Sequence, residues 1–223
     1  MSFGDVAIDE IRPTRCLPGR SLLTGLLANA LGLEHREVVA LDRLQDRLRF
    51  AARLDEAGIS VVDYQTAEIR KDDPLWTTHG LPAERAGGDQ SYTGPVLRYR
   101  HYRADAAVTV ALTLVPSEET PDLATVEAAL RRPERPLFIG RKSCPPSRPV
   151  FAHSVEADSL VAALDALSDA DQAALIETED DPGEPAGRRV VEVADRRDWQ
   201  LGLHAGQSRR REVRRQPIGA REP

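Results

Sequence analysis

The segment 140–149 carries the side chains of this chain that are best suited to binding an anion. It follows the apolar run 137–139, so it leaves the end of a predicted strand. Arg141 and Lys142 are adjacent cations, Ser143 adds a hydroxyl group, and the glycine before them lets the backbone approach a ligand closely. Prolines fix the shape of the loop, because they cannot join a regular hydrogen-bond ladder. The sequence predicts a phosphate-binding loop; an exposed strand connection with solvated cations is the open alternative.

Two further segments combine cations with groups that recognise phosphates or bases. Residues 12–21 run into a predicted helix start, where free N–H groups and the helix dipole attract a phosphate. Residues 98–103 interleave cations with aromatic rings, a pattern suited to single-stranded nucleic acid. A capped helix with exposed arginines and a solvated edge strand are the respective alternatives. The predicted binding residues of the three segments are Arg12, Arg15, Arg20, Ser21, Arg98, Arg100, Arg103, Arg141, Lys142 and Ser143.

The histidines give little support for catalysis. The five histidines show no HxxxH spacing, and the CxxC, GxSxG and Walker motifs are absent from the sequence. We therefore predict no catalytic residue, no metal and no cofactor. His101 with Tyr99 or Tyr102 has the acid and base groups of a metal-independent ribonuclease, and this activity is the alternative function.

Charge is distributed unevenly along this chain of 223 residues, whose net charge is −6. Residues 155–185 hold ten acids and no base, whereas residues 196–223 hold eight arginines against three acids. The total argues against a general nucleic-acid binder and directs attention to local basic patches. All cations except Lys71 and Lys142 are arginines, which suit bidentate phosphate contacts.

The composition also bears on the cellular location. No apolar run reaches the roughly 18 residues of a membrane-spanning helix, and residues 1–5 lack the features of a signal peptide. Two cysteines, Cys16 and Cys144, do not form a disulfide framework. We expect a cytoplasmic protein with no membrane partner.

The elements that must position these residues alternate between helices and strands. Apolar spacing and capping residues predict helices from Ser21, over residues 37–57 and from residues 120–122 to Pro133. Alternating and β-branched residues predict strands over residues 59–69, 106–114 and 137–139. Residues 70–94 hold too much glycine and proline for a long regular element. The strand, helix, strand order of the second half predicts an α+β fold of the ferredoxin-like type.

The pattern after residue 153 is less regular. Residues 159–167 and 169–176 are predicted to form short acidic helices, and residues 180–187 a polar linker. Residues 190–203 are predicted to form a β-hairpin. We expect the basic tail from Gln207 to fray.

Four segments together resemble one protein family. They are RPTRCLPGRSLLTGLLANALGL (residues 12–33), VVDYQTA (61–67), RHYRADAAVTVAL (100–112) and LFIGRKSCPPSRPVF (137–151). In this order they are similar to the Cas five-family subunits of type I-E CRISPR Cascade complexes. The resemblance covers residues 1–153 and, more loosely, residues 195–199, whereas residues 155–185 do not match.

The resemblance implies a particular domain organisation. Residues 1–153 would form a ferredoxin-like (RRM-like) RNA-binding domain with a protruding β-hairpin thumb at about residues 70–103. Residues 154–223 would form a small β-rich C-terminal domain with a basic tail. Relatives begin with an apolar strand and a Gly-Pro turn before a segment like residues 1–4. That first strand is missing here, so we expect the natural chain to be longer by about ten residues.

The resemblance also implies a function. The chain would be a non-catalytic subunit of a ribonucleoprotein complex in antiviral defence, binding the 5′ handle of crRNA and capping the backbone filament. Its thumb would contact the neighbouring backbone subunit, the large subunit would dock nearby, and target DNA would be reached only indirectly. The predicted binding residues would then contact RNA. Two alternatives stay open: an endoribonuclease that processes pre-crRNA, as in a sister subtype, and a scaffold without RNA contact.

Overall fold

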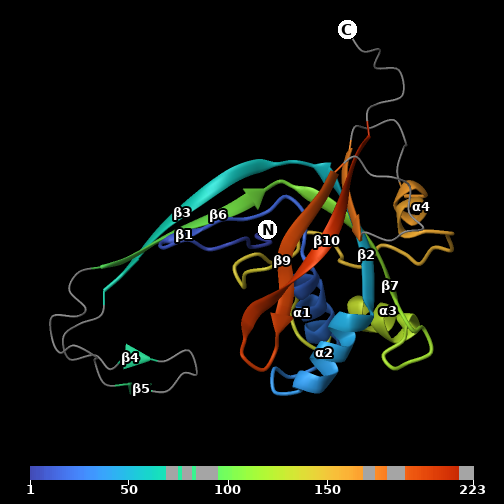
Figure 1. Cartoon of the computed structure of the whole chain (residues 1–223), viewed down its shortest axis with the longest axis horizontal. Coiled ribbons are helices and arrows are strands. Elements are labelled where there is room, and N and C mark those ends of the chain that lie inside the picture. The colour runs from blue at the N-terminus through green and yellow to red at the C-terminus, as the bar shows by residue number, and fades with distance from the viewer. Residues whose placement is uncertain (69–74, 77–81, 84–94, 168–173, 180–188, 216–223) are drawn as a thin grey trace, which may run out of the picture.

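The computed structural model describes residues 1–68, 75–76, 82–83, 95–167, 174–179 and 189–215 (Figure 1). The helices are α1 (Arg20–Leu31), α2 (Val38–Arg47), α3 (Leu123–Arg131) and α4 (Leu160–Asp165). The strands are β1 (Ile11–Arg12), β2 (Leu48–Glu56), β3 (Ile59–Ala67), β4 (Leu75–Trp76), β5 (Pro82–Ala83), β6 (Val96–Ala104), β7 (Ala107–Leu114), β8 (Ala174–Glu179), β9 (Arg189–Asp198) and β10 (Leu203–Arg215). This mixture of helices and strands confirms the α+β class.

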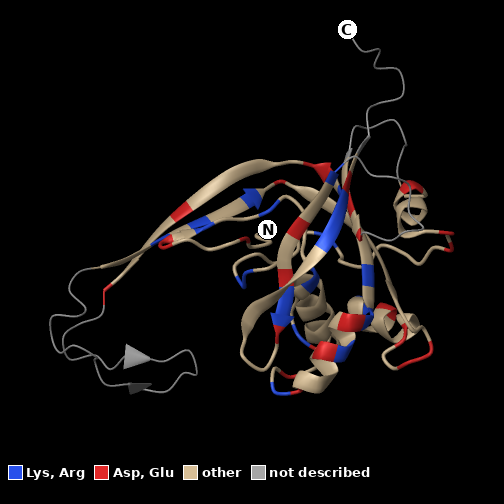
Figure 2. Ribbon diagram, viewed as in Figure 1, with Lys and Arg blue, Asp and Glu red and all other residues tan. Residues whose placement is uncertain are grey.

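Two sheets organise the molecule. One has five antiparallel strands in the order β7-β2-β8-β10-β9, and the other has three in the order β1-β6-β3. In the second sheet β1 runs parallel to β6, and β6 is antiparallel to β3. Arginines lie on strands of both sheets, including β6 and β10 (Figure 2). β4 and β5 pair only with each other among the described strands.

One long two-stranded ribbon connects the two sheets. β2 pairs with β7, β3 pairs with β6, and only two residues separate the paired strands on each side. On one side the break contains Gly58, whose φ of +61° is left-handed, and on the other it contains Asp105 with a φ of +52°. A Cβ atom at Gly58 would lie 2.2 Å from the carbonyl oxygen of Ala104, so this position requires glycine. Beyond the break, β3 and β6 curve away from the body (Figure 1).

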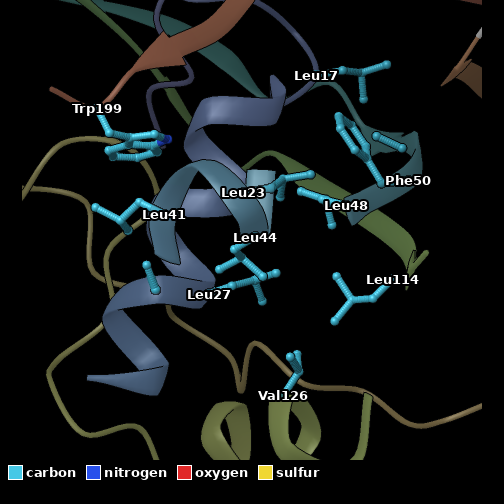
Figure 3. Packing of buried hydrophobic residues seen from close by; sticks show 12 residues of the cluster. Leu17, Leu23, Leu27, Leu41, Leu44, Leu48, Phe50, Leu114, Val126 and Trp199 are labelled. Carbon is cyan, nitrogen blue, oxygen red and sulfur yellow. The ribbon is translucent and has the colours of Figure 1, made fainter. Parts of the chain in front are cut away.

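The hydrophobic core lies between the five-stranded sheet and helices α1, α2 and α3 (Figure 3). Leu23 and Leu27 of α1 pack with Leu44 of α2, Phe50 of β2 and Val126 of α3. A smaller cluster on the other face of the sheet joins α4 to β2 and β8. The sheet is therefore covered on both faces, whereas β3 is exposed along nearly its whole length.

The first predicted helix is confirmed, and the second is confirmed only over its first half. α1 begins at Arg20 with Gly19 as its N-cap, so the predicted N-cap Ser21 lies inside the helix, and α1 ends before Gly32. The helix predicted over residues 37–57 ends at Arg47 and is followed by β2. Leucines at positions 44 and 48 and an alanine at position 52 fit both elements, because a spacing of four residues satisfies a helix and a strand alike. Leu48, Phe50 and Ala52 are buried on one face of β2, so this segment follows the two-residue period of a strand.

The predicted strands near the ribbon are confirmed, but the one at 137–139 is wrong. β3 and β7 lie within the predicted ranges, and α3 is capped by Asp122, whose side chain accepts the N–H of Thr125. Residues 137–139 join no ladder among the described strands. Ile139 instead accepts the N–H of Ser2 and donates to the carbonyl of Cys144. Local contacts therefore replace the expected strand pairing.

The C-terminal part differs most from the prediction. α4 and the β9–β10 hairpin are confirmed, although Trp199 lies in the turn. The helix predicted over 169–176 is wrong where it is described, because residues 174–176 belong to β8. The predicted fraying from Gln207 is wrong for residues 207–215, which belong to β10, a strand paired on both sides. The linker predicted at 180–187 lies outside the described residues.

Strands from both sides of the predicted domain boundary at residue 153 share one sheet. β8, from the C-terminal part, pairs with β2 from the N-terminal part along four residues. The division of the chain into two folding units stays a prediction. No helix in the described ranges is long and apolar enough to span a bilayer.

Candidate nucleic-acid interface

The three-stranded sheet brings two of the predicted basic segments together. The register places Arg12 of β1 beside Arg100 of β6, and paired residues project from the same face. Because side chains alternate along a strand, Arg98 and Tyr102 share that face with Arg100. The basic face consists of Arg12, Arg98, Arg100 and Tyr102. All four side chains are partly exposed.

The third basic segment reaches this face through Arg141. Its Nη1 donates to the carbonyl oxygen of His101 at 3.1 Å, and its Nη2 donates to that of Arg12 at 3.1 Å. The guanidinium carbon lies 4.8 Å from the centre of the Tyr102 ring, within the range of a cation–π contact. The loop after residue 139 therefore packs against both β1 and β6.

Lys142 and Ser143, the other predicted residues of this loop, are exposed beside the basic face. The hydroxyl groups of Ser143 and Tyr102 are 3.4 Å apart. Cys144 is buried, and its N–H donates to the carbonyl of Arg141 at 2.8 Å, which closes the turn. The loop is thus a tight turn that presents Lys142 to solvent.

The opposite face of the same sheet is apolar and aromatic. We define the aromatic face as Ile11, Val62, Tyr64 and Tyr99. The two tyrosine rings face each other across the strands with their centres 5.1 Å apart. Tyr64 is 54% exposed and Val62 is 50% exposed, so nothing in the described chain covers this face.

Arg103 does not join the basic face, contrary to the prediction. It alternates with Arg100 and Tyr102 and so projects from the aromatic side. Its Nε donates to the carbonyl of Ala57 at 3.0 Å, and its backbone exchanges two hydrogen bonds with Met1. Arg103 therefore braces the bend between the two sheets.

Arg20 is buried, and its predicted role as a solvent-facing phosphate ligand is wrong for this conformation. Its guanidinium donates to the carbonyls of Gln45 and Leu48 and pairs with the carboxylate of Glu179. It also lies over the Phe50 ring. Burial lowers the pKa of Arg20, and the nearby Glu179 carboxylate opposes that shift. The charge is matched inside the protein and does not face solvent.

The start of α1 already holds an anion supplied by the chain itself. The N–H of Arg20 donates to Asp195 Oδ2 at 2.8 Å, and Arg210 donates to the same oxygen at 2.8 Å. Burial favours protonation of Asp195, but Arg210 and these hydrogen bonds outweigh it and hold its pKa below the ordinary value. Ser21 lies one residue further along, with its Oγ 3.0 Å from Nε2 of His204. The phosphate predicted for this helix start is thus replaced by a carboxylate.

Arg15 is likewise engaged within the fold. Its Nη2 lies 2.8 Å from both carboxylate oxygens of Glu177 on β8. Burial raises the pKa of Glu177, and Arg15 opposes the shift. Of the first predicted basic segment, only Arg12 joins the basic face.

The structure separates one of the two residue pairs named for the alternative of a ribonuclease. His101 and Tyr102 are neighbours on a strand, so they project from opposite faces and cannot act on one phosphate together. Tyr99 shares the face of His101, together with Arg103, so the register keeps the His101–Tyr99 pair of that alternative. Within the described ranges, no group of three or more potential metal ligands occurs.

The sequence analysis missed the carboxylates that neutralise the buried arginines. Glu177 and Glu179 were included in an acidic stretch without an assigned role, and Asp195 was not singled out. Their signal was the alternation of Ile176 and Thr178 with the two glutamates, which is typical of a strand with a polar face. The aromatic face was also missed, although Val62, Tyr64 and Tyr99 were present in predicted strands or basic segments.

Two solved structures share this fold. A chain of a "CRISPR RNA-guided surveillance complex" superposes with a TM-score of 0.63 at 22% identity, over 96% of this chain and 85% of that chain. A second, described as "Crystal structure of Cas protein", superposes with a TM-score of 0.58 at 23% identity, over 96% and 88% of the respective chains. At these identities the likeness shows the fold alone.

Sequence comparison identifies the family. The family model described as "CRISPR-associated protein (Cas_Cas5)" matches residues 1–211. The "CRISPR system Cascade subunit CasD" of Escherichia coli (strain K12) is 30% identical over 163 residues, which are 73% of this chain and 70% of the relative. A match over nearly the whole length, together with the shared fold, leads to one conclusion: the chain belongs to the Cas5 family of CRISPR-associated proteins.

Proposed function

We propose that this chain is a non-catalytic subunit of a CRISPR surveillance complex and that it binds the 5′ handle of crRNA through the basic face. The observation that carries the proposal is the convergence of segments far apart in sequence on one partly exposed surface. Arg12, Arg100 and Lys142 come from three such segments. Phosphate contacts of this kind supply most of the affinity of a protein for single-stranded RNA.

The cations of the basic face keep their charge available. Within the described ranges, no carboxylate forms an ion pair with Arg12, Arg98 or Arg100. Arg12 donates to two backbone carbonyls, and Arg98 to one. Asp63 lies opposite Arg100 in the register, and its carboxylate accepts a hydrogen bond from Gln65. A phosphate can therefore pair with these cations without displacing a carboxylate from them.

The aromatic face supports the part of the proposal that concerns protein partners. Exposed aromatic and branched side chains on a projecting sheet are typical of protein interfaces. A thin ribbon is marginally stable when both of its faces are in water, so contact with another subunit would stabilise it. We propose that this face contacts the neighbouring backbone subunit, that the large subunit docks nearby, and that target DNA is met only indirectly. A cytoplasmic location is part of the same proposal.

The finer description of the fold is also a proposal. In it, a ferredoxin-like domain carries a hairpin thumb at about residues 70–103, most of which lie outside the described residues, and one strand position of the domain is unfilled. β7 forms one edge of the five-stranded sheet. Val108, Val110 and Leu112 pack against the core from β7 but are only partly buried. An unfilled position beside β7 predicts fast hydrogen exchange at its outward amides, and uniform protection along β7 would contradict it.

The experiment that tests RNA binding measures the affinity for handle RNA as a function of salt. Replacing Arg12 and Arg100 together by alanine should lower the slope of log affinity against log salt by about 0.7 for each lost contact. Arg36, whose side chain is 82% exposed in a turn away from this face, provides the control variant Arg36→Ala. An unchanged slope in the double variant would remove the basic face from the proposal.

Handle RNA and the purified chain also serve to test the two alternative functions. Handle RNA that crosslinks to other subunits but not to this chain in the assembled complex would favour the scaffold. Cleavage of repeat RNA by the purified chain in EDTA, abolished by His101→Ala, would favour the ribonuclease. We expect a crosslink and no cleavage.

A further inference from the structure

We infer that Arg141 is a positioning residue: it holds β1 against β6 so that the basic face can form, and it does not itself contact RNA. The inference rests on the proposed function, since it concerns how that RNA-binding surface is assembled. The sequence pointed instead to Arg141 as a direct phosphate contact.

The guanidinium of Arg141 is already engaged on three sides. Both Nη atoms donate to backbone carbonyls, those of His101 and Arg12, and the face of the group lies against the Tyr102 ring. An arginine has five N–H groups in a rigid fork, and its geometry suits two acceptors side by side. Here the two acceptors are backbone carbonyls on the adjacent strands β6 and β1. They occupy the donors that a phosphate would otherwise use.

β1 depends on contacts of this kind because it is very short. Its ladder with β6 contains only the pairs Ile11–Tyr99 and Arg12–Arg100. One further backbone bond, from the N–H of Tyr99 to the carbonyl of Glu10 at 2.9 Å, supports the start of the strand. Arg141 adds a side-chain donor at the other end of β1, to the carbonyl of Arg12. Without it, β1 is held to β6 by this short ladder alone, and the Arg12 side chain is held less firmly beside Arg100.

The loop is built to aim Arg141 at this site. Gly140 has a left-handed φ of +89°, and a Cβ atom there would lie 1.7 Å from the carbonyl oxygen of Ser2. The N–H of Ser2 donates to Ile139 at 3.1 Å, so the N-terminal residues pack directly against the loop. The turn closed by Cys144 fixes the backbone on the other side of Arg141. These contacts orient Arg141 toward the strands and leave Lys142 facing solvent.

A charge-conserving substitution separates positioning from contact. Arg141→Lys keeps the positive charge but lacks the fork that reaches two carbonyls. A phosphate contact would largely survive this change, because lysine also binds phosphates. A positioning role would not, since β1 would be released in the lysine variant as it is in Arg141→Ala.

The experiment is a double-mutant cycle measured with handle RNA. We expect Arg141→Lys and Arg141→Ala to weaken binding equally, by about tenfold, and Arg12→Ala to have little further effect in either background. Lys142→Ala, the matched control in the same turn, should add its effect to that of Arg12→Ala. Near wild-type affinity of Arg141→Lys, or additive effects of Arg141→Ala and Arg12→Ala, would overturn the inference.

A second measurement needs no RNA. The amide of Tyr99 should exchange faster in Arg141→Lys than in the wild-type chain, and at the wild-type rate in Lys142→Ala. If wild-type protein fails to bind handle RNA, the proposed function fails while this exchange rate still tests the role of Arg141. If Arg141→Lys does not fold, Tyr102→Leu removes the ring beneath the guanidinium and should also speed exchange at Tyr99. An unchanged rate in the folded variant would overturn the inference.

Discussion

Arginines in the five-stranded sheet are used differently from arginines in the three-stranded sheet. Arg53 and Arg210 are buried in the first, and each pairs with a carboxylate of the chain. Arg12, Arg98 and Arg100 of the second are partly exposed, and no described carboxylate pairs with them. Burial explains the difference, because a cation removed from water requires a counter-charge whereas water solvates a cation on the projecting ribbon. An arginine without an internal counter-charge is the one available to a ligand.

The largest effect on stability is expected when a carboxylate that pairs with a buried arginine is removed. Asp195→Asn removes the anion at the start of α1 and leaves Arg210 with only the more distant carboxylate of Glu179, at 3.6 Å, so we expect a loss of about 3–5 kcal/mol of folding free energy. The pKa of Asp195 is lowered in the fold, so its contribution is full above the ordinary value of 3.8 and is lost as pH falls through the lowered value. Urea unfolding at several pH values measures both effects. Wild-type stability of the variant would show that the buried carboxylate is dispensable.

A second prediction concerns the bend that separates the two sheets. In Gly58→Ala the new Cβ atom would meet backbone atoms of the ribbon, and the left-handed φ adds strain. We expect a loss of about 1–3 kcal/mol. Hydrogen exchange should rise in β3 and β6 while β2 and β7 stay protected. Equal exchange in both halves of the ribbon would mean that the two sheets unfold together.

A third prediction contrasts Glu177 with Asp195. The pKa of Glu177 is raised, so the fold favours its protonated form. Its contribution to stability is full below the ordinary value of 4.5 and is lost as pH rises through the raised value. Glu177→Gln cannot ionise, so we expect near wild-type stability at neutral pH and a flatter pH dependence above 4.5. A loss as large as that of Asp195→Asn would show that Arg15 requires the charge.

The smallest effect on stability should come from the basic face itself. Arg100→Ala removes a partly exposed side chain without an ion-pair partner among the described residues, so we expect a change within about 0.5 kcal/mol. Handle affinity should nevertheless fall and become less sensitive to salt. Thermal unfolding beside RNA titration makes the comparison. A large loss of stability would place Arg100 with the buried arginines.

Elements with their own local signals could be predicted from the sequence. The helix start near residues 120–122 and the alternation in β7 depend on neighbouring residues alone, and both were found, although the cap is Asp122 and not Thr120. The end of α2 was missed because the leucines at 44 and 48 have a spacing shared by helix and strand. Which period holds is decided by packing against α1 and β7, and that information is not local.

In the candidate site, too, local features could be predicted from the sequence and distant contacts could not. Arg12, Arg98 and Arg100 were singled out as cations, and their segments do meet on one face. Arg15 and Arg20 carry the same charge in the same segment, but their carboxylate partners lie 162 and 159 residues further along the chain. Sequence reasoning recognises a cation readily. It does not reveal whether a distant strand will neutralise that cation.

The pairing of Arg20 with distant carboxylates has a consequence for synthesis on the ribosome. α1 is translated early, yet the groups that neutralise and cap its first residue, Glu179 and Asp195, emerge 159 and 175 residues later. Until then the nascent helix cannot bury Arg20 against β2 without an uncompensated charge. β8 and β10 also complete the sheet beneath α1. We therefore expect a nascent chain stalled before β10 to leave the start of α1 unpacked and sensitive to proteases.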